Sequence, residues 1–235
     1  MGIIAAVIIP AYNEAENLEI LIPSIYTYAN SIAVYVVDDN SQDNTDEVIK
    51  KLQTKYPVIH LKRKKKLGRG TAVTFGFKEA FKNRKVDVFV EMDADQSHDP
   101  KELSKLISLV DKNSISSASR YIPKSKVYGT SKERKILSKV VNGFESILFG
   151  LPIHDYTNGF RAYPRNAVAL LIKHKYKSSG FATIAESTYL LYKKGFKLKE
   201  ISTKFVNRRI GGSKVDIHEM YISLRDLLRV RFSKI

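Results

Sequence analysis

Residues 86–100 read VDVFVEMDADQSHDP, in which a hydrophobic run leads directly into two aspartates. The run from Val86 to Met92 is typical of a buried strand. Asp93 and Asp95 follow it at positions i and i+2, so both carboxylates can converge on one hard cation, which would in turn hold phosphate oxygens. An acidic pair at a strand end is also commonly a solvated exit from the strand. Other motifs in the sequence distinguish between a cation site and a solvated strand exit.

Short β-rich runs alternate with helical patterns through the first half of the chain. We expect strands at 3–9, 32–37, 58–61, 86–92 and 115–118, and helices at 15–29, 43–54, 71–81 and 101–110. This alternation predicts an α/β fold, a mostly parallel sheet flanked by helices. Ligands of such sheets bind beyond the carboxyl ends of the strands. Polar clusters at 10–14, 38–41 and 93–95 all fall there, which predicts one shared site.

The composition limits the class of protein. The chain has 235 residues, of which 43% are hydrophobic, enough for one large or one and a half domains. It has no cysteine, which excludes disulfides, thiolate metal sites and cysteine nucleophiles. No run approaches 18 apolar residues, and the start, Met1-Gly2-Ile3-Ile4, lacks the charged region of a signal peptide. We therefore expect no transmembrane helix, and only peripheral or partner-mediated contact with a membrane.

Positive charge is in excess, with 40 Lys and Arg against 24 Asp and Glu and a net charge of +16. Such a balance fits three kinds of partner: nucleic acid, an anionic membrane surface, or substrates that carry phosphate. The positive residues cluster at 62–66, 124–139, 208–209 and 225–234. Two amphipathic segments, 132–149 and 217–232, contain part of this charge. Each predicts a helix that either packs on the core or lies in a membrane interface.

The segments 10–14, PAYNE, and 36–45, VVDDNSQDNT, follow the first two predicted strands. Tyr12 could stack on a nucleobase, Glu14 could face donors on a ribose or base, and Asp39 could accept hydrogen bonds from either. Both turns also have an ordinary structural interpretation, in which their polar side chains cap the following helices. Each segment alone is therefore a weak signal.

Two glycine-containing segments are further candidates. The segment 67–72, LGRGTA, resembles half of a phosphate-cradling loop before a helix N-terminus, although it lacks the full pattern. The segment 155–162, DYTNGFRA, contains Gly159, which could allow close approach of the backbone to a substrate. Arg161 in the same segment could be structural and pair with Asp155. Near the end, 205–214 reads FVNRRIGGSK, a cationic segment suited to phosphates.

Seven motifs occur together in one order between Ile4 and Lys214. They are PAYNE, VVDDNSQDNT, LGRGTA, DADQSHDP, ASRY, DYTNGFRA and FVNRRIGGSK. With them the chain resembles the inverting nucleotide-sugar glycosyltransferases with a GT-A fold, and more closely the dolichol-phosphate mannose synthases and other polyprenyl-phosphate glycosyltransferases. The resemblance implies a Rossmann-like GT-A catalytic domain over 1–215, including an acceptor loop and amphipathic helix at 122–150. A C-terminal amphipathic helix at 216–235 would follow.

The resemblance also implies the activity. The expected reaction is transfer of mannose from GDP-mannose to dolichyl or another polyprenyl phosphate with inversion, dependent on Mg²⁺ or Mn²⁺. The expected location is the cytoplasmic face of a membrane, with peripheral attachment and room for a membrane-anchoring protein partner. Nucleic acid is not an expected partner.

Carried over residue by residue, the resemblance implies three overlapping sets. The nucleotide-sugar-binding set is Pro10, Tyr12, Glu14, Val37, Asp39, Asp93, Ala94, Asp95, Ser97, Arg120, Arg208 and Lys214. The metal-binding set is Asp93, Asp95 and Ser97, and the catalytic set is Asp95, Arg120 and Arg208. Arg120, Arg208 and Lys214 would bind phosphates. Ser97 departs from relatives that carry a glutamine metal ligand at this position.

The expected chemistry follows from the acceptor. A lipid monophosphate is ionised near neutral pH, so its oxygen is already a nucleophile and needs no catalytic base. The difficult step is the departure of GDP, whose developing charge a divalent cation can stabilise. Asp95 is the first choice of direct ligand, and Asp93 would assist.

Three alternatives stay open at this point. The donor could be UDP-glucose, or the acceptor could be a sugar hydroxyl, which would need a general base; Glu186 is the best remaining acid for that role. A basic nucleic-acid-binding protein is a more distant alternative. Against it, no aromatic residues are interleaved with the lysine block at 62–66 and no recognition motif occurs.

Overall fold

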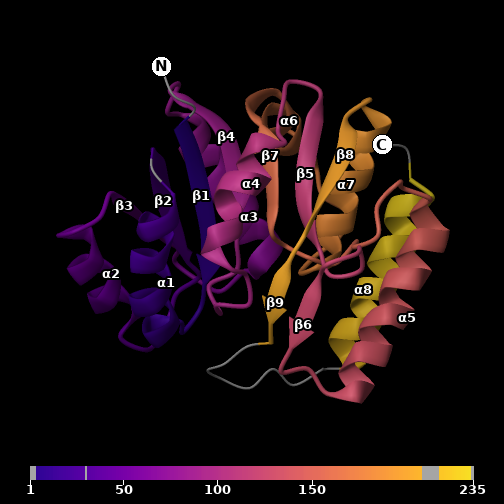
Figure 1. Cartoon of the computed structure of the whole chain (residues 1–235), viewed down its shortest axis with the longest axis horizontal. Coiled ribbons are helices and arrows are strands. Elements are labelled where there is room, and N and C mark those ends of the chain that lie inside the picture. Colours follow the sequence, from indigo (N-terminus) through magenta and orange to yellow (C-terminus); the bar gives the residue numbers. More distant parts are fainter. Residues whose placement is uncertain (1–3, 30, 208–216, 234–235) are drawn as a thin grey trace.

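A seven-stranded sheet in the order β3-β2-β1-β4-β7-β5-β8 forms the middle layer of the protein (Figure 1). The computed structural model describes residues 4–29, 31–207 and 217–233. The strands of this sheet are β1 (Ile4–Ala11), β2 (Ile32–Asp38), β3 (Val58–Lys62), β4 (Val86–Glu91), β5 (Ser114–Ser119), β7 (Arg161–Pro164) and β8 (Lys197–Ser202). Among the described residues only β7 runs antiparallel to its neighbours, and the other strand pairs of this sheet are parallel. The predicted mostly parallel sheet is confirmed.

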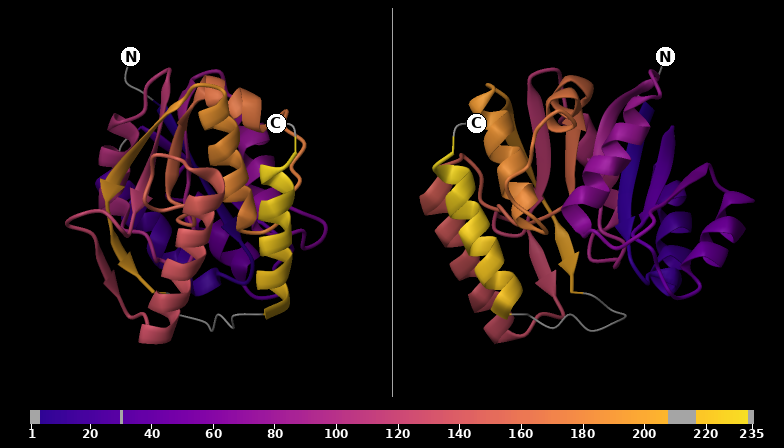
Figure 2. Two further views of the ribbon diagram at one scale, coloured as in Figure 1. Left: turned by 90° about the vertical axis from the view of Figure 1, so that its right-hand side faces the viewer. Right: turned by 180° about the vertical axis from the view of Figure 1, so that it is seen from behind.

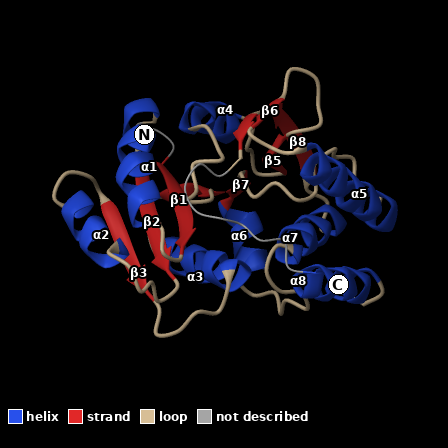
Figure 3. Cartoon of the chain, turned by 90° about the horizontal axis from the view of Figure 1, so that it is seen from below, coloured by secondary structure: helices blue, strands red, loops and turns tan. Residues whose placement is uncertain are grey.

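Helices cover both faces of the sheet, as Figure 3 shows from below. One face packs against α1 (Ala15–Tyr28), α2 (Thr45–Gln53) and α4 (Leu103–Ser108), which follows a short 3₁₀ turn at Pro100–Glu102. The other packs against α3 (Arg69–Phe81), α6 (Arg165–Leu171) and α7 (Ala182–Lys193). Each face has its own apolar core because β1, β2 and β4 are buried on both sides.

Two further helices lie side by side at one end of the sheet (Figures 1 and 2). They are α5 (Lys132–Phe149) and α8 (Ile217–Arg231). Ser131 caps the start of α5 by accepting a hydrogen bond from Arg134 N, and Gly150 ends the helix at a positive φ of 61°. Inward-facing residues of both helices meet α7 in a third core cluster, which includes Phe149, Tyr189, Leu227 and Val230.

The outer sides of α5 and α8 leave large apolar side chains exposed. They are Ile136, Val140 and Ile147 on α5, Leu224 and Leu228 on α8, and Phe232 just after it. Part of each predicted amphipathic helix thus packs on the core and part faces outward. Within the described ranges, no helix is both long enough and apolar enough to cross a bilayer.

A two-stranded parallel ribbon stands below the sheet in Figure 1. It consists of β6 (Lys126–Tyr128) and β9 (Lys204–Val206). β6 lies in the 122–130 loop and β9 leads into the cationic 205–214 segment. The ribbon therefore joins two segments that the sequence connects with substrate binding.

One carboxyl group on the inner side of α5 is buried. Glu145 is 4% exposed, and its Oε2 has no hydrogen-bond partner among the described residues. Burial raises the pKa of Glu145 to about 8; the charge of Arg161 opposes this shift and that of Asp155 adds to it. Near pH 7 the side chain is therefore mostly neutral in the folded protein.

We predict a stability change with pH that originates at Glu145. Its pKa rises from 4.5 to about 8 on folding, so its stabilising contribution is complete below pH 4.5 and is lost as the pH rises to about 8. Relative to Glu145→Gln, the wild-type free energy of unfolding should fall by up to about 1.4 kcal/mol per pH unit in that window. Urea denaturation of both proteins at several pH values measures this difference. A constant difference would contradict the assignment.

Candidate active site

A pocket of about 270 Å³ opens at the carboxyl ends of β1, β2 and β4. The structure brings the three polar clusters of the sequence together there. The lining residues from the predicted nucleotide-sugar-binding set are Pro10, Tyr12, Glu14, Asp39, Asp93, Ala94 and Asp95. The other lining residues are Ala11, Lys66, Gly68, Arg69, Ala72 and Phe181. Four carboxylates therefore face a single pocket together with a lysine and an arginine.

The loops that build this pocket are held in unusual backbone conformations. Asn13, Asn40 and Gln96, one after each of the three strands, have positive φ values of 56°, 68° and 60°. Non-glycine residues in this region are uncommon and concentrate at functional sites. Side chains brace the first two loops: Asn13 N donates to Ser41 Oγ at 2.9 Å, and Asn13 Oδ1 accepts from Gln42 N at 2.8 Å.

Asp39 fastens the glycine loop to the pocket. Its Oδ2 accepts hydrogen bonds from Leu67 N and Gly68 N at 2.9 and 2.7 Å, and its Oδ1 lies 2.9 Å from Arg63 Nη1. Gly68 adopts a φ of 86°, which favours glycine and turns the chain into α3. Asp39 lines the pocket, and its carboxylate also has a structural role that the sequence did not indicate.

The loop that Asp39 holds places Lys66 against Tyr12. The Lys66 Nζ lies 3.9 Å from the centre of the Tyr12 ring, a close cation–π contact. In the sequence Lys66 belongs to a charged block that is usually a solvated face. Its position directly before a glycine loop was the signal that could have identified it as a pocket residue.

Arg69 lines the pocket and binds two acidic side chains. Its Nε donates to Asp93 Oδ1 at 2.8 Å, and its Nη1 donates to Glu91 Oε2 at 3.2 Å. Burial alone would raise the pKa of Asp93, but the charge and hydrogen bond of Arg69 outweigh it and lower that pKa. Asp93 is therefore a carboxylate near neutral pH.

Asp95 lines the pocket beside Asp93 and is a candidate metal ligand. Its Oδ1 accepts a hydrogen bond from Ser97 N at 3.1 Å. Ser97 itself is buried and is not among the residues lining the pocket, so its predicted role as a third ligand has no support from this geometry. No group of three or more Asp, Glu or His side chains within the described ranges could hold a metal ion.

This donor set fits a hard divalent cation that is shared with a ligand. Mg²⁺ is commonly bound through one or two carboxylates together with substrate phosphates and water, and Mn²⁺ accepts similar oxygen ligands. Asp93 and Asp95 supply two such carboxylates at one end of the pocket. The remaining coordination positions would come from phosphate oxygens and water.

His98 stabilises the loop that follows β4 and carries Asp93 and Asp95. Its ring stacks on Phe160 with the ring centres 5.0 Å apart, and its Nδ1 accepts a hydrogen bond from Asp93 N at 3.3 Å. The side chain is 2% exposed. His98 therefore fixes the backbone at Asp93.

A second, basic pocket of about 330 Å³ lies between β5, the ribbon and α5. Its charged lining side chains are all cationic: Arg120, Arg134, Lys135 and Lys139. The other lining residues are Tyr121, Val127, Thr130, Ser138, Phe205 and Asn207. Arg120 was predicted to bind phosphate, and the structure places it here rather than in the lining of the acidic pocket.

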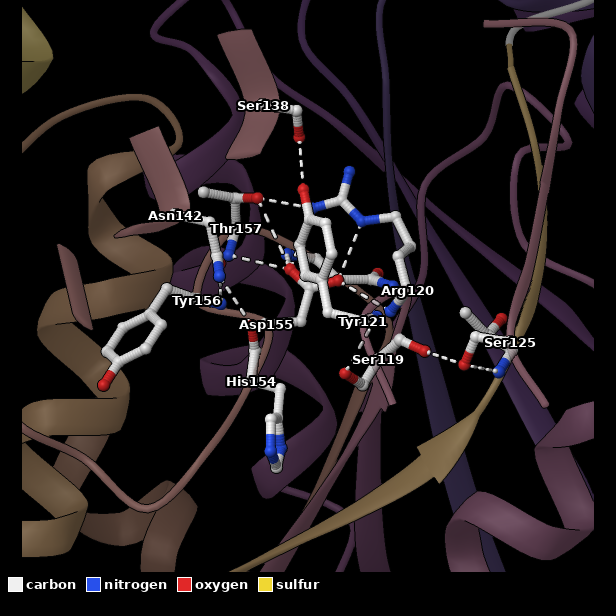
Figure 4. Close-up of polar contacts among 12 residues, drawn as sticks. Ser119, Arg120, Tyr121, Ser125, Ser138, Asn142, His154, Asp155, Tyr156 and Thr157 are labelled. Atoms are coloured by element: carbon white, nitrogen blue, oxygen red, sulfur yellow. Dashed lines mark hydrogen bonds and ion pairs between the residues drawn. The ribbon is translucent and has the colours of Figure 1, made fainter. Parts of the chain in front are cut away.

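Asp155 holds Arg120 in place, as Figure 4 shows. The Arg120 Nε and Nη2 donate to the two carboxylate oxygens of Asp155, each at 2.8 Å, and Nη2 also donates to Thr157 Oγ1. Close by, the hydroxyl groups of Tyr121 and Ser138 are 2.7 Å apart. The carboxylate of Asp155 is fully buried and fixes the direction of the guanidinium.

This pairing corrects one expectation about the DYTNGFRA segment. Arg161 is structural, but its guanidinium donates to backbone carbonyls, including those of Asp155 and Tyr156 at 2.9 and 3.1 Å. The carboxylate of Asp155 instead accepts hydrogen bonds from Arg120. Arg161 therefore binds backbone carbonyl oxygens of this turn, whereas Arg120 binds the carboxylate of Asp155.

Other predicted site residues lie elsewhere. Val37 is buried in the core against α3 and lines neither pocket. Arg208 and Lys214 lie outside the described residues. Glu186 is buried in α7, where it accepts hydrogen bonds from Ser178 N at 2.9 Å and faces His174 Nε2 at 2.7 Å. Glu186 is thus a structural acid that lines neither pocket.

Comparison with known proteins identifies the class. Residues 6–171 match the Glycosyl transferase family 2. The polyprenol monophosphomannose synthase of Mycolicibacterium smegmatis is 36% identical over 214 residues, which are 89% of this chain and 80% of that protein. The dolichol-phosphate mannosyltransferase of Pyrococcus furiosus is 36% identical over 230 residues, 96% of this chain and 63% of that protein.

A solved structure supports the fold. A mannosyltransferase from Pyrobaculum calidifontis, in complex with GDP-Man and Mn²⁺, is similar with a TM-score of 0.65 and 19% identity. The match covers 97% of this chain and 62% of that one. The family match and the fold thus define a glycosyltransferase with a GT-A-like fold. The chain belongs to the Glycosyl transferase family 2, which confirms the resemblance found in its motifs.

We predict that Asp155→Asn destabilises the protein by about 3 kcal/mol, because it leaves the mostly buried guanidinium of Arg120 without its counter-charge. The matched control is Asp111→Asn, which removes an exposed ion pair to Lys199 and should cost much less. Urea denaturation measures both free energies of unfolding. Equal losses would show that the Arg120–Asp155 pair has no special structural role.

Proposed function

We propose that this glycosyltransferase transfers mannose from GDP-mannose to a polyprenyl (dolichyl) phosphate with inversion, which gives a β-mannosyl phosphate lipid. The observation that carries the proposal is the pairing of a carboxylate-lined pocket with a basic pocket at one edge of the sheet. The first suits a nucleotide sugar with a divalent cation, and the second suits an anionic acceptor. The two relatives described above are named for mannose transfer of this kind.

The donor would occupy the acidic pocket. Tyr12, after Lys66 has moved from its ring, offers an apolar surface for the guanine, while Pro10, Glu14 and Asp39 line the nucleoside part. The diphosphate would lie at Asp93, Ala94 and Asp95 with Mg²⁺ or Mn²⁺. When bound, the cation would stabilise the negative charge that develops on departing GDP. Asp95 is the first choice of direct ligand because Arg69 already holds one oxygen of Asp93.

The acceptor phosphate would occupy the basic pocket. A phosphate monoester is ionised near pH 7, so the protein has to bind and orient it rather than remove a proton from it. Arg120 is fixed by Asp155 through its Nε and Nη2, so its Nη1 would donate to a phosphate oxygen, and Arg134, Lys135 and Lys139 add charge from α5. Val127 and Phe205 provide apolar surface for the first part of the lipid.

The two pockets are close enough to act on each other electrostatically. Burial raises and Arg69 lowers the pKa of Asp93, and the charge of Arg120 adds to the lowering. In this proposal Arg120 would bring the acceptor oxygen towards the anomeric carbon. We retain Arg208 and Lys214 as predicted phosphate ligands.

The exposed sides of α5 and α8 would rest on the membrane. Ile136, Val140 and Ile147 share one side of α5 at 100° per residue, roughly opposite the side that lines the basic pocket. Arg225, Arg229 and Arg231 add exposed positive charge on α8. A surface of this composition suits peripheral binding to anionic lipid, here proposed at the cytoplasmic face. A membrane-anchoring protein partner stays a prediction.

The donor can be tested by binding and by rate. In the presence of Mn²⁺ we expect tighter calorimetric binding of GDP-mannose than of UDP-glucose, and mannosyl transfer to a polyprenyl phosphate.

Asp95→Asn should lower the transfer rate by about 100-fold or more, because several kcal/mol of charge stabilisation are lost. The control Asp87→Asn alters an exposed residue at the other end of β4 and should leave the rate unchanged. Tighter binding of UDP-glucose, or near-normal activity of Asp95→Asn, would refute this assignment.

The membrane surface can be tested separately. Val140→Glu combined with Ile147→Glu places charge on side chains that are 62% and 89% exposed, so folding should not suffer. We expect this variant to lose flotation with vesicles rich in phosphatidylglycerol. Ile20→Glu, which alters an exposed isoleucine on α1, is the matched control and should float like the wild type. Equal flotation of all three proteins would argue against binding through α5.

A further inference from the structure

Arg69 occupies a crowded position between three parts of the chain. It starts α3, and its side chain is 11% exposed. Its guanidinium bonds to Asp93 and Glu91 as described, and its Nη2 also points to Gly159 O at 3.5 Å. One side of the group therefore touches the acidic loop after β4, and the other touches the DYTNGFRA segment.

Gly159 makes room for this guanidinium. A Cβ at position 159 would lie 2.1 Å from Arg69 Nη2 and 2.9 Å from Cζ, closer than atoms can approach. The backbone of Gly159 is outside the positive-φ region, so an alanine there would meet no conformational obstacle of its own. The sequence suggested that this glycine admits a substrate, but the structure shows that it admits Arg69.

Arg69 leaves one oxygen of Asp93 available. Oδ1 accepts the hydrogen bond from Arg69 Nε, whereas Oδ2 accepts none from the described residues and lies 3.9 Å from His98 Nε2. His98 also holds the backbone nitrogen of Asp93. The carboxylate is thus fixed at one oxygen and along the backbone, with its second oxygen free to bind a cation.

Arg69 also balances a buried acid. Glu91 is 4% exposed, and besides Arg69 it accepts a hydrogen bond from the hydroxyl group of Tyr163. Without Arg69, Glu91 and Asp93 would be neighbouring carboxylates with no opposite charge from the side chain that now joins them, and their repulsion would push the more exposed Asp93 out of position.

We propose that Arg69 is a positioning residue for the cation end of the donor pocket, and that Gly159 serves it by leaving space for its guanidinium. Arg69 aims Asp93 by holding Oδ1, and the Asp93 and Asp95 carboxylates are the groups that would hold a divalent cation. This inference rests on the proposed metal-dependent donor site and adds two residues that support it from outside the metal-binding set.

The geometry predicts a specific coupling between positions 69 and 159. Gly159→Ala displaces the guanidinium and should mimic the loss of Arg69, although every charge is retained. Once Arg69→Ala has emptied the space, the added methyl group has only ordinary contacts, the nearest being Asp93 Oδ1 at 3.4 Å. In that background Gly159→Ala should therefore have no further effect.

The experiment measures Mn²⁺ binding in the presence of GDP, by the loss of the electron paramagnetic resonance signal of free Mn²⁺. We expect Arg69→Ala and Gly159→Ala each to weaken binding by about tenfold or more, which is the usual effect of removing a group that orients a metal ligand. The double variant should bind as Arg69→Ala does. Gly143→Ala is the matched control, because a Cβ there meets nothing within 4 Å, and it should bind like the wild type.

A conservative variant and a folding control complete the test. Arg69→Lys retains the positive charge but cannot bridge Asp93 and Glu91 with a planar fork, so it should still weaken Mn²⁺ binding. Circular dichroism confirms which variants are folded, and Gly159→Ala carries the test if Arg69→Ala is not. Wild-type affinity in Gly159→Ala, or an equal further loss when Gly159→Ala is added to Arg69→Ala, would overturn the inference. A wild type that binds no Mn²⁺ with GDP would overturn the proposed donor site as well.

Discussion

The arrangement of the donor pocket depends on one constraint, the close approach of a buried carboxylate, Glu91, and a partly buried one, Asp93, at the end of β4. Glu91 is 4% exposed and the Asp93 side chain is 23% exposed, and removing a carboxylate from water costs several kcal/mol unless it is paired. Arg69 provides that pairing from the start of α3, and the missing side chain of Gly159 provides the space. This interaction ties α3, β4 and the segment before β7 together, and it determines how Asp93 faces the pocket.

The first half of the fold could be predicted because its patterns are strong. β1, β2 and β4 are apolar runs that a sheet buries on both faces, and the helices between them are long enough to show their own periodicity. Parallel strands place their carboxyl ends at one edge, so the motifs PAYNE, VVDDNSQDNT and DADQSHDP had to meet there. The sequence alone therefore predicts that Tyr12, Asp39, Asp93 and Asp95 lie close together, and all four line one pocket.

The second half gave weaker signals. β7 has four residues, and β6 and β9 have three each, too few for a pattern to appear. The site contacts missed there join residues far apart in the sequence, such as Arg120 with Asp155 across 35 positions and Arg69 with Gly159 across 90. Such pairs depend on the antiparallel insertion of β7 between β4 and β5, which no local pattern reveals.

The central claim is direct displacement of GDP by a phosphate oxygen that is held in the basic pocket. The anomeric configuration of the lipid product tests it most directly. Purified protein with GDP-mannose, a polyprenyl phosphate and Mn²⁺ should give a product whose nuclear magnetic resonance spectrum shows a β-linked mannosyl phosphate, with one GDP released for each lipid formed. An α-linked product, or release of GDP without a mannosylated lipid, would contradict the account.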